Sequence, residues 1–188
     1  MGHHERTPGP RQAAVKTILE AEGLLIRELA AGDLDFVAAM LAHPEVMAFW
    51  PRTYDREEAA NWIRLMQERY ARDGYGYWLL VDTALDRPVG QVGLLRQEIA
   101  GKAEIGLGYI LHRPWWGRGY AVRAGALVCD HAFAELKPAY LVCTIRPGNA
   151  ASRRVAERLG FEAGETIDYA GFPHIVYARS RERTPDHP

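Results

Sequence analysis

Two glycines one residue apart are the most informative feature of this chain. They lie in the segment Trp116–Ala121, which reads WGRGYA and falls between a predicted strand and a predicted helix. Glycines at this spacing let the backbone turn tightly and approach a ligand with no Cβ atom in the way. The first amides of the next helix have no acceptor within the helix, and the helix dipole favours an anion there. With Arg118 as a mobile counter-charge, the segment predicts a site for a ligand with adjacent phosphates.

Two common nucleotide-binding motifs do not fit this segment. The Rossmann pattern GxGxxG lacks its third glycine, because Arg123 and Ala124 occupy the region where it would fall. The sequence has no Gly-Lys-Ser/Thr, so the lysine of a P-loop is also missing. Nicotinamide dinucleotides and nucleoside triphosphates are therefore disfavoured. Taken alone, the segment is also compatible with a plain strand-to-helix turn.

A second pair of candidate residues lies downstream. Asn149 follows a predicted strand, and Ser152 falls on the first turn of the next helix. Asn149 could be a plain N-cap, or its side-chain amide could hydrogen-bond an extended ligand arm that carries amides. Ser152 on its own is equally compatible with a surface serine. The residue types alone leave these alternatives open.

Two residues are candidates for proton transfer. Glu104 lies on the strand before the glycine turn and is the first choice for a general base, acting directly or through water. An ion pair with an arginine is the alternative for this carboxylate. His112, just before the turn, titrates near neutrality but could also be a solvated loop histidine.

Hydrophobic periodicity predicts the elements that must position these residues. Three strands joined by short turns indicate an antiparallel meander, and the later segments alternate between helix and strand. The predicted strands cover 24–29, 75–81, 88–95, 103–111, 140–145, 161–167 and 172–178, and the predicted helices run from a cap at Asp33, from Arg56 to before Gly74, over 119–136 and over 150–159, with Gly160 as the last C-cap. The expected fold is a single α/β (α+β) domain with a mixed sheet of about seven strands and about four helices.

Composition excludes several classes of protein. The chain has 188 residues, of which 48% are hydrophobic and 25% charged, as expected for one globular domain. A net charge of −1 gives no argument for nucleic acid or an anionic membrane as partner. No apolar run approaches the roughly 20 residues of a membrane span, and the N-terminus lacks a secretory pattern, so we expect a cytoplasmic protein. Residues 1–22 and 181–188 are predicted to be flexible tails around a domain at 23–180.

Neither metal binding nor disulfide bonding is expected. Cys129 and Cys143 are the only cysteines, and no paired Cys/His spacing accompanies them. Both lie in apolar contexts, which predicts small buried side chains.

In combination, these motifs resemble the GNAT superfamily of N-acetyltransferases. The resemblance rests on Glu104-Ile105-Gly106, on Trp116–Ala121, and on Asn149-x-x-Ser152 with Glu157–Phe161, and it covers roughly Leu24 to Arg179. Order and spacing are similar to the RimJ/RimL-type branch, which acetylates protein N-termini and various small amines. The resemblance implies a sheet splayed between its fourth and fifth strands, with acetyl-CoA as cosubstrate in the opening.

The resemblance also implies roles for individual residues. A backbone N–H of the stretch 109–111, with Ile110 as first choice, would donate to the thioester carbonyl. Trp116 replaces the usual Gln or Arg of the phosphate loop, as is common in the RimJ/RimL branch. The tyrosine acid of many relatives would fall at Ala156, so Ser152 is expected to face the thiolate, with Glu104 as base. The implied cofactor-binding residues are Tyr109, Ile110, Leu111, Trp116, Gly117, Arg118, Gly119, Tyr120, Ala121, Asn149 and Ser152.

The acceptor amine is not specified by these motifs. Phe49, Trp50, Tyr54 and Trp78 could wall an acceptor pocket, although aromatic residues more often pack in a core. A protein N-terminus, a polyamine, an aminoglycoside and an amino-acid derivative all remain open, as do a monomer and a homodimer. Because the tyrosine is missing, a non-catalytic acyl-CoA sensor or interaction module on the same fold is the alternative function.

Overall fold

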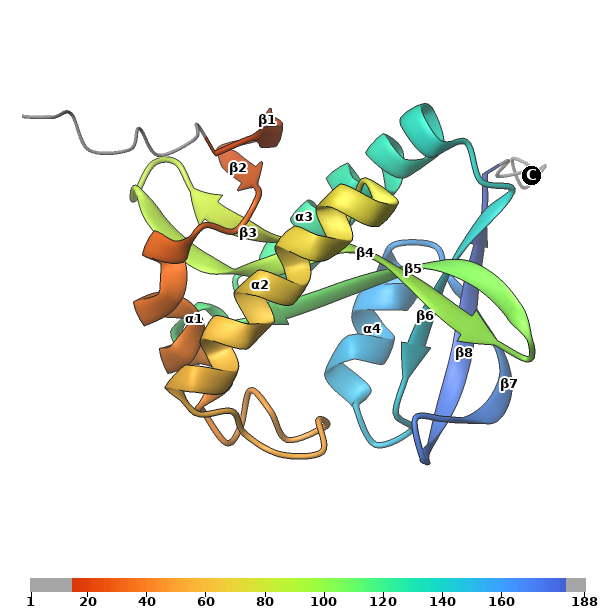
Figure 1. Ribbon diagram of the computed structural model, residues 1–188. Helices are drawn as coiled ribbons and strands as arrows, with labels where there is room; N and C mark the ends of the chain where they lie inside the picture. The colour runs from red at the N-terminus through yellow and green to blue at the C-terminus, as the bar shows by residue number, and fades with distance from the viewer. Residues whose placement is uncertain (1–14, 182–188) are drawn as a thin grey trace, which may run out of the picture.

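Eight strands form one mixed sheet in the computed structural model, which describes residues 15–181 of the chain (Figure 1). The strands are β1 (Thr17–Ala21), β2 (Leu24–Arg27), β3 (Tyr77–Asp82), β4 (Arg87–Ile99), β5 (Lys102–Leu111), β6 (Tyr140–Ile145), β7 (Glu162–Tyr169) and β8 (Phe172–Ser180). Their order across the sheet is β1-β2-β3-β4-β5-β6-β8-β7, and every neighbouring pair is antiparallel except β5 and β6. The predicted mixed sheet is confirmed.

The eighth strand is β1, at a place where the sequence predicted a tail. Thr17–Ala21 pairs antiparallel with β2 through a tight turn at Glu22 and Gly23, both of which have positive φ. The boundary predicted at residue 22 is therefore wrong for this strand. Residues 1–14 and 182–188, which make up most of the two predicted tails, lie outside the described residues.

Four α-helices cover the two faces of the sheet. They are α1 (Leu34–Leu41), α2 (Arg56–Asp73), α3 (Tyr120–His131) and α4 (Ala150–Arg158), and a π-helical turn, Ala132–Leu136, extends α3. In Figure 1, α2 crosses in front of the sheet and α3 lies behind it. Asp55 caps α2 with its side chain through the Glu58 amide at 2.9 Å, and Gly74 ends α2 with φ 81°. In the described residues, none of the helices is long and apolar enough to cross a membrane.

Successive side chains of β3 pack into two separate apolar clusters, one on each face of the sheet. Trp78 and Leu80 pack in the cluster that contains Val128 of α3. Tyr77 and Leu79 belong to the cluster formed with α1 and α2. This follows from the two-residue period of a strand, because successive side chains point to opposite faces.

The sheet opens between β5 and β6, the fourth and fifth of the predicted strands. The two strands form a register pair at Gly106 and Val142 and then diverge towards their C-terminal ends. Gln97 of β4 closes the narrow end, because its side chain lies over Gly106 and its Nε2 donates to the Thr144 hydroxyl at 3.2 Å. The predicted splay is therefore confirmed, and it creates an opening in the middle of the sheet.

Candidate functional site

The glycine turn ends directly at the N-terminus of α3. Gly117 has φ 75° and Gly119 has φ 80°, a left-handed conformation that favours glycine. A Cβ atom added to either glycine would meet nothing within 4 Å, so the space above the turn is open. Gly119 is the N-cap of α3, and within residues 15–181 no side chain accepts a hydrogen bond from the first amides of this helix. Open space and free amides at a helix N-terminus suit an anionic ligand.

Side chains around the turn hold it against the end of β5. Trp116 donates from Nε1 to the Leu111 carbonyl at 2.8 Å. Tyr120 is buried, and its hydroxyl donates to Asp82 at 2.6 Å, so this side chain faces the core. Arg118 is exposed, with its guanidinium 5.0 Å from the ring centre of Trp115. The backbone, Arg118 and part of the Trp116 ring therefore face solvent.

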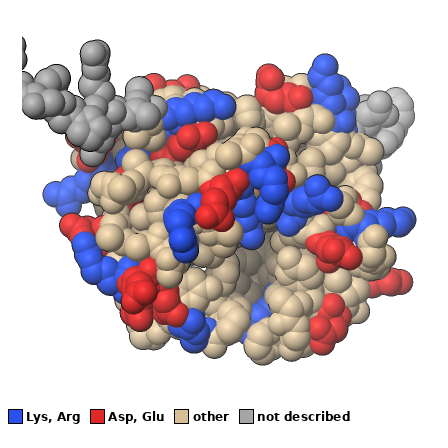
Figure 2. Space-filling view, viewed as in Figure 1, with Lys and Arg blue, Asp and Glu red and all other residues tan. Residues whose placement is uncertain are grey.

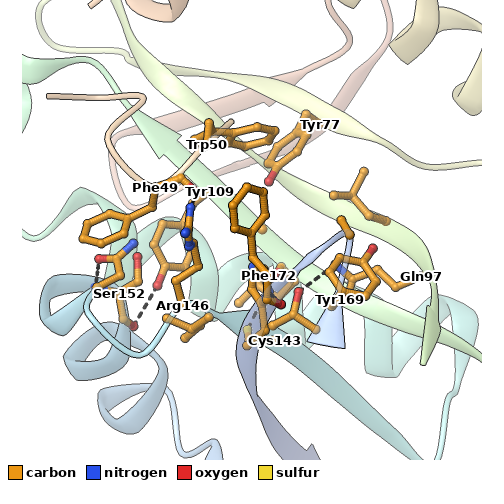
Figure 3. A pocket seen from close by; sticks show the side chains of 18 of the residues that line it. Phe49, Trp50, Tyr77, Gln97, Tyr109, Cys143, Arg146, Ser152, Tyr169 and Phe172 are labelled. Atoms are coloured by element: carbon orange, nitrogen blue, oxygen red, sulfur yellow. Dashed lines mark hydrogen bonds between the residues drawn. The ribbon is translucent and has the colours of Figure 1, made fainter. Parts of the chain in front are cut away.

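A cavity of about 400 Å³ lies at the opening between β5 and β6. Figure 2 shows a hollow in the lower middle of this face, with Lys and Arg side chains along its upper rim. The residues that line the cavity come from the α1–α2 loop, α2, β3, β4, the two splayed strands, the start of α4 and the β7–β8 hairpin. Eight of the residues that line it are aromatic: Phe49, Trp50, Tyr54, Trp62, Tyr77, Tyr109, Tyr169 and Phe172. Figure 3 shows several of them around the cavity.

Two glycines let one of these aromatic side chains reach the opening. Tyr77, Gly93 and Gly108 are register partners on β3, β4 and β5. A Cβ atom at Gly108 would lie 2.3 Å from the Tyr77 hydroxyl, so the phenol crosses strand β4 and ends above β5. Burial raises the pKa of the Tyr77 phenol. A neutral hydroxyl is thereby held over the middle of the splayed sheet.

Tyr109, Asn149 and Ser152 meet at the cavity. The Tyr109 hydroxyl donates to the backbone carbonyl of Ser152 at 3.0 Å (Figure 3). The Asn149 side chain accepts a hydrogen bond from the Ser152 amide at 3.1 Å, which is the N-cap that the sequence left open as an alternative. All three residues line the cavity, and burial raises the pKa of Tyr109. The structure thus joins β5 to the start of α4 across the opening.

Residues 23–162 match a family model described as the acetyltransferase (GNAT) domain. The chain belongs to this GNAT family. The uncharacterized protein YkkB of Bacillus subtilis (strain 168) is 30% identical over 165 residues, which are 87% of this chain and 96% of YkkB. The family match supports acetyl transfer as the chemistry of the site.

Solved structures of GNAT proteins share the fold. A GNAT-family acetyltransferase from Bacillus anthracis has a TM-score of 0.76 at 21% identity, over 89% of this chain and 100% of that one. RimL, a ribosomal L7/L12 alpha-N-protein acetyltransferase solved in complex with coenzyme A, has a TM-score of 0.72 at 19% identity, over 88% of this chain and 98% of RimL. At these identities the similarity shows the fold and leaves the branch within the GNAT family open.

Trp78 lies away from the cavity of this GNAT domain, so its predicted place in an acceptor pocket is wrong. Its side chain is 1% exposed and packs edge-on to His131 at 6.1 Å, on the α3 side of the sheet. The neighbouring Tyr77 lines the cavity instead, because its side chain points to the opposite face of the sheet, the one covered by α2. Trp50 and Tyr54, by contrast, do line the cavity.

Glu104 is also outside the cavity lining. Its carboxylate accepts a hydrogen bond from the Tyr140 hydroxyl at 2.6 Å, and this bond raises the pKa of Tyr140. The partner is a tyrosine rather than the arginine considered from the sequence. The backbone stretch that ends at Ile110 and Leu111 lies on the same strand, but neither of these two residues lines the cavity with Tyr109.

His112, the second candidate base, lies against α1 and the loop that follows it. Its ring is 5.7 Å from Phe36 and 6.4 Å from His43, and its buried Nδ1 has no hydrogen-bond partner among the described residues. Burial lowers the pKa of His112, and the charge of His43 adds to this. The position indicates a packed structural histidine.

His112→Gln should therefore change the pH dependence of stability and leave turnover almost unaltered. Because the folded pKa lies below the unfolded value of about 6.5, the unfolded chain binds more protons, and unfolding becomes easier as pH falls. Thermal unfolding between pH 7.5 and 5.5 should show a weaker loss of stability in the variant. The rate of thiol release at pH 8 should stay within about threefold of the rate of the unsubstituted protein. A tenfold loss of turnover would instead identify His112 as the base.

Several residues that line the cavity belong to none of the motifs found in the sequence. Arg69, Arg146, Tyr169 and His174 come from four separate elements and fit no motif. The glycines inside β4 and β5 were the available clue, because glycine within a strand often marks a place where another group approaches closely.

Proposed function

We propose that this protein moves an acetyl group from acetyl-CoA to a primary amine by direct transfer in a ternary complex. The proposal rests on two features at the opening between β5 and β6. A free helix N-terminus follows the end of β5, and residues 107–109 of the same strand line the cavity together with the α1–α2 loop. A phosphate-bearing cosubstrate and an amine can therefore approach the splayed strands from different sides.

The residues present fit acetyl-CoA. Amides of Gly117–Ala121 would hold the pyrophosphate, since both glycines leave space there and the helix start is uncapped. Asn149 and Ser152 would contact the arm that carries amides, and a backbone N–H of the stretch 109–111 would bind the thioester carbonyl. When bound, the cosubstrate supplies an activated acetyl group.

Transfer requires one bond to form, one to break and one proton to move. The amine nitrogen bonds to the acetyl carbon, the carbon–sulfur bond breaks, the nitrogen loses a proton and the sulfur gains one. Ser152 is the proposed donor to the sulfur, because it lines the cavity, and the Tyr109 hydroxyl would hold it there through the Ser152 carbonyl. Among residues 15–181, no Asp or Glu lines the cavity, so we propose that water takes the proton from the amine.

The order and spacing of the motifs support a RimJ/RimL-like acceptor site within the family. A non-catalytic acyl-CoA sensor is the second candidate, because Ala156 stands where many relatives carry a tyrosine acid. Both candidates predict binding of acetyl-CoA. They differ in whether an added amine causes release of the CoA thiol, as only the acetyltransferase predicts.

Thermal unfolding and thiol release together test the proposal. Acetyl-CoA and CoA at 100 times the dissociation constant should each stabilise the folded protein by about 2.7 kcal/mol, whereas ATP should not. Thiol release should then depend on both the enzyme and an added primary amine. Stabilisation without thiol release across a broad amine panel would favour the sensor. Absence of stabilisation by either CoA species would reject both candidates.

A further inference from the structure

The cavity has a strongly one-sided charge. Its lining contains three arginines, Arg69, Arg96 and Arg146, and, over residues 15–181, no carboxylate. Within the same residues, the salt bridges involve none of these three arginines. The arginines come from α2, from β4 and from the residue after β6, so they face the cavity from separate elements. No residue of the glycine turn lines the cavity, so these charges are separate from the proposed phosphate site.

Two of the arginines lie deep enough to meet a ligand. Arg146 is half-buried; its guanidinium lies 4.1 Å from the ring centre of Phe172, and its Nη1 donates to the Phe49 carbonyl at 3.4 Å. Figure 3 shows this side chain rising from the splayed strand towards Trp50. Arg69 is also half-buried, and its charge opposes the rise that burial causes in the pKa of two cavity phenols, Tyr77 and Tyr169.

A carboxylate near Arg69 and Arg96 already has a partner. Asp73 ends α2, and Arg72 binds it at 2.6 Å, which is the main cause of its lowered pKa. The charges of Arg96 and Arg69 also act on Asp73. Asp73 is therefore balanced by Arg72 and by the charges of Arg96 and Arg69, and it does not line the cavity.

Aromatic walls often attract cations, but here two ring faces are taken by the protein's own arginines. Arg146 covers Phe172, and Arg52 lies 5.3 Å from the ring centre of Tyr54. A polycationic acceptor would thus meet neither a carboxylate nor these two faces, and it would meet like charge from Arg69 and Arg146.

We propose that the acceptor is a primary amine that carries a carboxylate close to the amino group, as in a free amino acid or the N-terminus of an acidic peptide. This inference rests on the proposed acetyl transfer and names its substrate class. Guanidinium groups bind carboxylates with charge-assisted hydrogen bonds, so Arg69 and Arg146 would hold the anionic end. The same positive charge favours the neutral form of a bound amine, which is the nucleophilic form, and this suits a cavity lined by no carboxylate.

Matched amines test the charge preference. Thiol release is measured with L-phenylalanine against L-phenylalaninamide, with the peptide Ser-Glu-Phe against Ser-Lys-Phe, and with spermidine and kanamycin. We expect kcat/KM to be at least about tenfold higher for the anionic member of at least one pair, and spermidine and kanamycin to be poor substrates. The pair that shows the difference tells a free amino acid from an acidic peptide. Equal or higher rates with both the amide and the Lys peptide, or with the polyamines, would overturn the inference and leave the proposed function standing.

Arginine variants connect the preference to the cavity. Arg69→Met should raise KM for the anionic amine about tenfold and change KM for its neutral or cationic partner less than threefold, with acetyl-CoA binding unaltered. Arg64→Met is the matched control, because Arg64 is an exposed residue of the same helix outside the cavity lining. An equal effect of Arg69→Met on both members of a pair would overturn the assignment. If no amine releases the thiol although acetyl-CoA binds, the proposed function itself fails, and the inference fails with it.

Discussion

Gly119→Asp is expected to weaken acetyl-CoA binding at least about 100-fold while the protein stays folded. The new side chain would project into open space, since a Cβ atom at this position meets nothing within 4 Å. Its carboxylate would occupy the N-terminus of α3, where the free amides would otherwise hold the pyrophosphate, and it would repel the phosphates directly. A non-glycine residue at φ 80° costs about 1–2 kcal/mol of stability, which most domains tolerate. Binding is measured by calorimetry, and folding by thermal unfolding.

Gly101→Asp is the matched control for this substitution. Gly101 has φ 77°, and its added Cβ would also meet nothing within 4 Å, but it lies in the β4–β5 turn. The control should lose similar stability and keep acetyl-CoA affinity within about twofold. Retained binding by Gly119→Asp would show that the cosubstrate phosphates bind elsewhere. Equal loss in both variants would point to a general effect of strain.

Local sequence signals were sufficient to predict most of the elements and the glycine turn before α3. Helix α2 begins at a capping residue and ends at a glycine, and both signals are local. The turn Gly117–Gly119 is equally local, because its conformation depends on the two glycines and on the helix that follows. The strand β1 was missed because its hairpin turns at Glu22-Gly23, a weaker turn signal than Asn-Gly or Asp-Gly.

The lining of the cavity could not be predicted in the same way, because it depends on contacts between segments that are distant in the sequence. Tyr77 and Trp78 are adjacent aromatic residues of one strand, and the sequence does not indicate which of them faces α2. Arg69 and Arg146 meet the same cavity only because the sheet splays and the α1–α2 loop folds over the opening. The spacing of residues along the sequence does not indicate that these two arginines lie at the same cavity. The hydrogen bond of Glu104 to Tyr140 was not predictable for the same reason, since Tyr140 comes from another strand.

Gly93→Ala is expected to lower the free energy of unfolding by about 3 kcal/mol, at the upper end of the cost of overpacking. Its Cβ atom would lie 1.9 Å from the Gly76 carbonyl oxygen and 2.7 Å from the Cα atom of Tyr77. Both are backbone atoms, so no side-chain rotation can relieve the contact, and β3 must move away from β4. Gly32→Ala is the control: a Cβ atom there meets nothing within 4 Å, and the change should stay within about 0.5 kcal/mol.

The same substitution probes how the cavity is built. Tyr77 pairs with Gly93 and reaches across it to place its hydroxyl over Gly108, so a shift of β3 would withdraw the phenol from the opening. Below the unfolding transition, Gly93→Ala should therefore raise KM for the amine while acetyl-CoA affinity changes less than about threefold, because the glycine turn follows β5 and is outside the cavity lining. Denaturant unfolding, calorimetry and thiol release measure the three quantities. An unchanged free energy of unfolding would mean that β3 and β4 adjust at no cost, and Gly93 would then not be what holds Tyr77 in place.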